Sequence, residues 1–102
     1  MTDEQREFHD AMVNIYVTAK RECGYNATRF LQMIGDMGGL AAAHALLRTS
    51  DVQYGFTELW EQNRLDLTVE NLVLQEKSQH LFTDAERATA RQRLTAHGFS
   101  TH

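Results

Sequence analysis

Hydrophobic residues recur along the first quarter of the chain at spacings that predict a long α-helix. Steps of three, four and one residue place apolar side chains on one helix face. Between about Thr2 and Glu22 that face comprises Phe8, Met12, Ile15, Tyr16, Ala19 and Cys23. Acidic residues in the first turns and basic residues in the last complement the helix dipole. Gly24 is expected to end the helix, because glycine adopts a left-handed conformation at little cost.

The segment 24–47 is the most apolar part of the chain and predicts a buried helical hairpin. Asn26 is expected to cap a helix that runs to about Asp36, because its side chain can accept a bond from a free backbone N–H. The glycine pair at 38–39 then makes a turn. The next helix is expected over 40–48, where several alanines allow a neighbouring backbone to come close.

The second half of the chain alternates short helical patterns with polar connections. A loop is expected over 49–55, followed by a short helix capped by Thr57. Leu65 and Leu67 alternate like a strand, but the chain offers no second strand to pair with them, so a turn is expected instead. The next helix is expected to be capped by Asp66 or Thr68.

A polar connection over 75–80 is expected to lead into the last helix. Thr83 and Glu86 form the T-x-x-E pattern of a capping box, in which each side chain bonds the other residue's backbone N–H. The helix should run to His97, with Gly98 ending it and Phe99 folding back on its last turn.

Size and composition favour one all-α domain over residues 1–102. The chain has no proline, 42% hydrophobic residues and a formal net charge of −4. At this length a single core is usual. We therefore expect a compact orthogonal bundle of five to six short helices, with the first and last helices packed over the central hairpin. The charged N-terminus and the absence of a long apolar run favour a cytoplasmic protein without membrane contact.

The block 60–70 is the strongest candidate for a binding surface. An aromatic anchor near an arginine is common among the residues that dominate protein interfaces. The simpler interpretation is that Trp60 fills the core and that Arg64 pairs with Asp66 or Glu70 to brace a turn. The candidate contact residues are Trp60, Glu61, Arg64, Asp66 and Glu70.

Two further clusters have both a functional and a structural interpretation. Tyr25 and Arg29 could bind an anion beside a helix N-terminus, although Arg29 is explained more simply as the partner of an acidic residue in the 58–70 region. A nucleic-acid contact through Arg87, Arg91 and Arg93 is the alternative function, but the net charge of −4 disfavours binding to phosphates. A solvated helix face explains these arginines more simply.

The sequence contains no catalytic or cofactor signature. Its histidines include no H-x-x-x-H pair, so neither a metal nor a cofactor is expected. Cys23 closes the apolar face of the first helix, where an inert thiol is usual. An enzyme is therefore the least favoured class, and a protein partner the most favoured.

Four blocks of this sequence resemble a family of small bacterial helical domains. They are GYNATRFLQMI, the GGL that precedes the alanine-rich helix, GFTELWEQNRLDLTVENLVL and LFTDAERATARQRL. Such domains are sometimes associated with HNH-type or restriction nucleases, but this chain has no HNH residues. The resemblance implies a helical accessory module of a bacterial defence or mobile-element system, and a small inhibitor of a larger machine is one form of that role.

Overall fold

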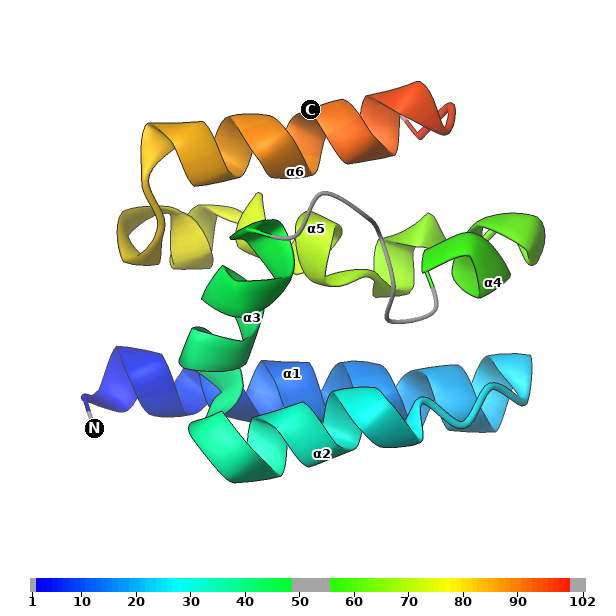
Figure 1. Ribbon diagram of the computed structural model, residues 1–102, viewed down its shortest axis with the longest axis horizontal. Helices are drawn as coiled ribbons and strands as arrows, with labels where there is room; N and C mark the ends of the chain where they lie inside the picture. The colour runs from blue at the N-terminus through cyan, green and yellow to red at the C-terminus, as the bar shows by residue number, and fades with distance from the viewer. Residues whose placement is uncertain (1, 49–55, 100–102) are drawn as a thin grey trace.

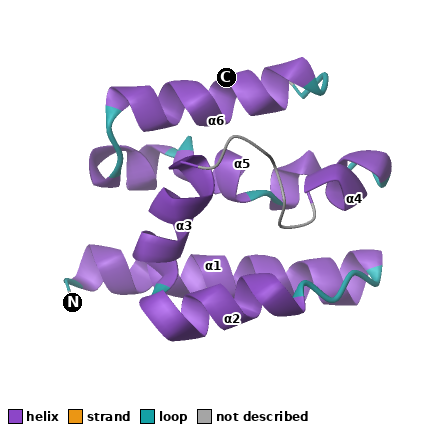
Figure 2. Cartoon of the chain, in the orientation of Figure 1, coloured by secondary structure: helices purple, strands orange, loops and turns teal. Residues whose placement is uncertain are grey.

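The computed structural model describes residues 2–48 and 56–99, and every regular element in these ranges is a helix (Figures 1 and 2). The predicted all-α fold is confirmed. The α-helices are α1 (Asp3–Cys23), α2 (Thr28–Met37), α3 (Gly39–Arg48), α4 (Phe56–Glu61), α5 (Val69–Val73) and α6 (Asp84–Ala96). Two 3-10 helices, η1 (Leu65–Leu67) and η2 (Glu76–Leu81), flank α5.

The helices form an orthogonal bundle with α3 at its centre. Figure 1 shows α1 and α2 side by side at the bottom, a row of short helices above them and α6 at the top. The chain turns by 118° between α2 and α3, so that α3 rises across the bundle. It contacts α1 and α2 on one side and α5 and α6 on the other. The predicted central helix pair therefore joins the two layers.

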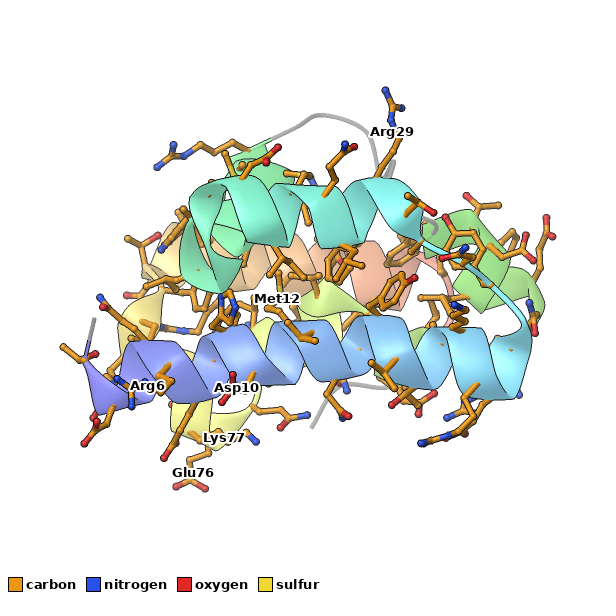
Figure 3. The ribbon with its side chains drawn as sticks, turned by 90° about the horizontal axis from the view of Figure 1, so that it is seen from below. Arg6, Asp10, Met12, Arg29, Glu76 and Lys77 are labelled. Atoms are coloured by element: carbon orange, nitrogen blue, oxygen red, sulfur yellow. The ribbon has the colours of Figure 1, made fainter. Side chains whose placement is uncertain are left out.

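The core lies where these layers meet. Met12 on α1 is fully buried and lies between α1 and α2 (Figure 3). Ala42 and Ala43 of α3 are also fully buried, and their small side chains allow the neighbouring helices to come close. Phe8 packs against Phe82 with ring centroids 5.3 Å apart, which ties the start of α1 to the segment before α6.

Several predicted helix ends are confirmed. Gly24 ends α1 with φ +66°, in the left-handed region that glycine tolerates. The capping box of Thr83 and Glu86 begins α6, and Thr68 caps α5 by accepting a bond from the N–H of Asn71. Phe99 donates its backbone N–H to the carbonyl of Leu94, as expected for a chain that folds back on the last turn.

Three local predictions were wrong. Asn26 does not cap α2, because its Oδ1 accepts a 2.7 Å hydrogen bond from the Tyr16 hydroxyl and Ala27 occupies the cap position. Thr57 lies inside α4, which already begins at Phe56. The expected connection over 75–80 mostly forms η2. The loop expected over 49–55 lies outside the described residues.

None of the described helices is long and apolar enough to span a bilayer alone. Only α2 and α3 taken together, as a pair bent by 118°, reach the required length and composition.

Candidate functional site

Trp60 lies at the end of the bundle formed by α4, on the right in Figure 1, and 46% of the residue is exposed. Its indole N–H donates a 3.1 Å hydrogen bond to the backbone carbonyl of His97. The indole also meets the His97 ring edge to face, with centroids 5.2 Å apart, and that ring contacts the buried Phe56. Trp60 is therefore held in one orientation while nearly half of it faces solvent.

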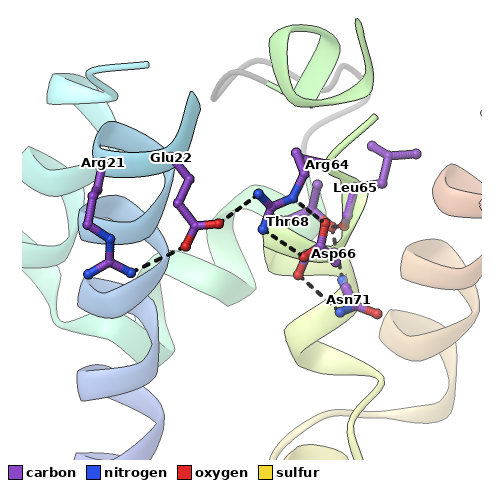
Figure 4. A network of polar contacts seen from close by, with 7 residues as sticks. All are labelled: Arg21, Glu22, Arg64, Leu65, Asp66, Thr68 and Asn71. Carbon is purple, nitrogen blue, oxygen red and sulfur yellow. Dashed lines mark hydrogen bonds and ion pairs between the residues drawn. The ribbon is translucent and has the colours of Figure 1, made fainter. Parts of the chain in front are cut away.

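Arg64 holds the neighbouring turn in place through a network of ion pairs (Figure 4). Its Nε and Nη2 atoms donate to the two carboxylate oxygens of Asp66 at 3.1 and 3.2 Å, and its Nη1 donates to Glu22 at 2.8 Å. Asn71 adds a 3.1 Å bond to the backbone carbonyl of Asp66. The predicted pairing with Asp66 is present, and Arg64 also connects η1 to the end of α1.

These contacts change the acidity of Glu22. The hydrogen bond from Arg64, followed by that from Arg21, lowers the pKa of Glu22 below its ordinary value of 4.5. A carboxyl group whose pKa is lower in the folded state stabilises the fold above the unfolded pKa, and this contribution is lost as the pH falls through the folded pKa.

We expect Arg64→Ala to lower the melting temperature slightly at pH 7, because exposed ion pairs stabilise folded proteins weakly. The difference from wild type should shrink as the pH is lowered from 5 toward 3, where Glu22 gains a proton. Thermal unfolding followed by circular dichroism at both pH values measures this effect. A difference that stays the same at low pH would show that Arg64 acts through packing of its side chain.

Glu70 does not belong to the surface around Trp60. Its side chain is fully buried and its Oε2 accepts a 3.0 Å bond from Nη1 of Arg93, which also donates to the backbone carbonyl of Leu46 at 3.1 Å. The other carboxylate oxygen of Glu70, Oε1, is buried without a hydrogen-bond partner. Glu61, in contrast, is exposed at the end of α4. Glu70 is thus part of a buried ion pair with Arg93, and the other four candidate residues form the surface group.

The candidate anion site shows little organisation. Arg29 is exposed and points away from the helices (Figure 3), and it forms no ion pair with any residue that the structure describes. Its expected pairing with the 58–70 region is therefore not found. Tyr25 is partly buried against the core in the segment before α2. Anion binding by these residues stays a prediction.

The three arginines of α6 do not form one basic face. Arg93 is paired with the buried Glu70, and Arg87 donates to the backbone carbonyls of Gln79 and Phe82, both at 2.6 Å. Arg91 is exposed. This leaves Arg91 as the member of the set that is placed to meet a phosphate.

Sequence reasoning missed several histidine contacts between helices, two of which involve α3. Nδ1 of His9 on α1 accepts a 2.9 Å bond from the N–H of Gly39, and Nδ1 of His44 on α3 pairs with the carboxylate of Glu86. No spacing rule could reveal them, because each joins residues of different helices. Among the described residues, no three His, Cys, Asp or Glu side chains are close enough together to hold a metal ion.

The comparisons with known proteins add no family or function. No protein-family model, no curated protein and no solved structure matches the chain. The arrangement of the side chains and the sequence resemblance are therefore the remaining indications of function. In that arrangement, the surface around Trp60 offers a rigid aromatic anchor beside charged groups.

Proposed function

We propose that this protein is a non-enzymatic interaction domain that acts in the cytoplasm and binds a protein partner through Trp60 and its surroundings. One observation carries the proposal: Trp60 is 46% exposed although its N–H group is already bonded within the chain. Tryptophan dominates many protein interfaces because it buries a large surface when it is covered. A fixed orientation also reduces the entropy lost on binding.

The charged neighbours support a protein partner further. Glu61 and Asp66 are exposed on the same short segment as Trp60, and Arg64 holds Asp66 in place. Charged residues around an aromatic anchor contribute to specificity and to the association rate. The wider role that we propose, as an accessory or small inhibitor in a bacterial defence or mobile-element system, rests on the sequence resemblance.

We expect Trp60→Ala to weaken binding of the partner about 30-fold, as truncation of a central interface residue costs about 2 kcal/mol or more. The full chain should first be used to capture partners from a bacterial lysate, with identification by mass spectrometry. Titration calorimetry with the purified partner then compares wild type and variant.

Val17→Ala is the matched control, because Val17 is 44% exposed but lies on α1. Trp60→Phe keeps an aromatic ring at this position but removes the N–H group that bonds to His97. Equal affinity of the wild type and Trp60→Ala for a partner that both capture would contradict the proposal. If Trp60→Ala has lost the circular dichroism signal of its helices, Trp60→Phe takes its place in the same titration.

A further inference from the structure

A groove of about 290 Å³ lies against the corner between α2 and α3. Figure 1 shows this corner on the left and α4, which carries Trp60, on the right. Its walls include two histidines, His9 and His44, together with the apolar residues Met37, Leu40 and Ala41. Met37 is 48% exposed. The volume is at the lower end of the range for small-molecule sites, which are mostly apolar with a few placed polar groups.

The hydrogen bond from Gly39 fixes the tautomer of His9. The backbone N–H of Gly39 can only donate, so Nδ1 of His9 accepts with its lone pair at 2.9 Å. The ring proton of His9 must then be on Nε2. This Nε2–H group is a hydrogen-bond donor, and no residue that the structure describes accepts from it.

Glu86 fixes the tautomer of His44, but here the ring proton is on Nδ1 and not on Nε2. Burial alone would raise the pKa of Glu86, but bonds from Thr83 and His44 outweigh it and lower the pKa. The charged carboxylate therefore accepts from Nδ1 of His44. In the neutral ring this leaves a lone pair on Nε2, which has no donor among the described residues. The ring also packs on Phe82, with centroids 4.7 Å apart.

We propose that this groove binds a small amide with an apolar substituent. The amide carbonyl accepts from Nε2–H of His9, the amide N–H donates to Nε2 of His44, and the substituent covers Met37 and Leu40. A carboxylate fits less well because it has no proton to donate to His44. A metal ion fits less well because Nε2 of His9 carries a proton and its Nδ1 is occupied.

The probe is 3-methylbutanamide, added to the full ¹⁵N-labelled chain at pH 8. Long-range ¹H–¹⁵N spectra report the ring nitrogens directly. We expect saturable shifts of the His9 and His44 Nε2 signals and no shift at His80, whose Nε2 is paired with Glu4. Absence of saturable shifts up to the solubility limit of the amide would overturn the proposal.

Two matched ligands test the hydrogen-bond pattern on the unaltered protein. N,N-dimethyl-3-methylbutanamide lacks the N–H group, and 3-methylbutanoate replaces the amide with a carboxylate. Each should bind about three- to tenfold more weakly, which is the effect of losing one hydrogen bond. Binding of the carboxylate that equals or exceeds that of the amide would overturn the donor and acceptor assignment.

Asparagine variants test the two histidines separately. In His44→Asn the side-chain N–H group can still donate to Glu86, and in His9→Asn the side-chain oxygen can still accept from Gly39, but each variant lacks Nε2. Both should bind the amide three- to tenfold more weakly while the backbone ¹H–¹⁵N spectrum stays that of a folded chain. Met37→Ala, at an exposed position, should also weaken binding. Unchanged affinity in all three variants would contradict the proposed site.

Discussion

Glu70→Ala is expected to lower the free energy of unfolding by about 3–5 kcal/mol, which is typical when one partner of a buried ion pair is removed. Only 12% of the Arg93 side chain is exposed, and Glu70 accepts a 3.0 Å bond from it. Without the carboxylate, the largely buried guanidinium group would lose this charge-assisted hydrogen bond. Urea unfolding monitored by circular dichroism provides the measurement.

A double variant distinguishes the net contribution of the ion pair to stability from the destabilisation caused by removing only one of its two charges. In Glu70→Leu with Arg93→Met, neither charge is left in the interior, and apolar residues of similar size fill the space. We expect the double variant to be close to wild type in stability, and clearly more stable than Glu70→Ala. If the double variant lost as much stability as Glu70→Ala, the ion pair itself would stabilise the fold.

The acidity of Glu70 gives this prediction a pH dependence. Burial raises the pKa of Glu70 above its ordinary value of 4.5, despite the opposing effect of Arg93. A group whose pKa is higher in the folded state contributes stability below the unfolded pKa, and loses that contribution as the pH rises through the folded pKa. The stability of Glu70→Gln relative to wild type should therefore increase as the pH rises from about 4 to neutrality.

Gly39→Ala is expected to lower the free energy of unfolding by about 2–4 kcal/mol, from overpacking and a weakened hydrogen bond. A Cβ atom at this position would lie 2.6 Å from the Cα of His9, and a backbone atom cannot rotate away as a side chain can. α1 and α3 would have to separate, which would stretch the bond from the Gly39 N–H to His9. The same urea unfolding experiment measures the loss.

Gly35→Ala is the matched control for Gly39→Ala. Gly35 lies within α2, is exposed, and has no atom within 4 Å of the position that a Cβ would occupy. Alanine should therefore stabilise this helix by about 0.5–1 kcal/mol, because it restricts the unfolded chain. Equal losses of stability in both variants would show that contact with His9 is not the cause.

The sequence predicted those parts of the fold that depend on neighbours along the chain. The spacing of Phe8 and Met12 identified the buried face of α1, and glycine chemistry predicted its end at Gly24. The capping box at Thr83 needs only residues three positions apart. Each of these features is set by local geometry, which the order of the residues already contains.

Other features were missed where residues on different helices determine the contacts of a side chain. Asn26 had the chemistry of a helix cap, but the Tyr16 hydroxyl bonds its Oδ1 instead. Glu70 was predicted to belong to the surface block, but it is buried and bonded to Arg93 on another helix. The groove with His9 and His44 exists only because α2 and α3 meet at their particular angle. None of these relations has a fixed spacing.

The position of α3 between the two layers also bears on how the chain folds. The pairs α1 with α2 and α5 with α6 each join segments that are close in sequence, and such local contacts form early and favour rapid folding. The layers also contact each other directly, through α1 with α5 and η1, but α3 is the helix that contacts both members of each pair. We therefore expect packing around its fully buried Ala42 and Ala43 to help join the two halves of the chain into one cooperative unit.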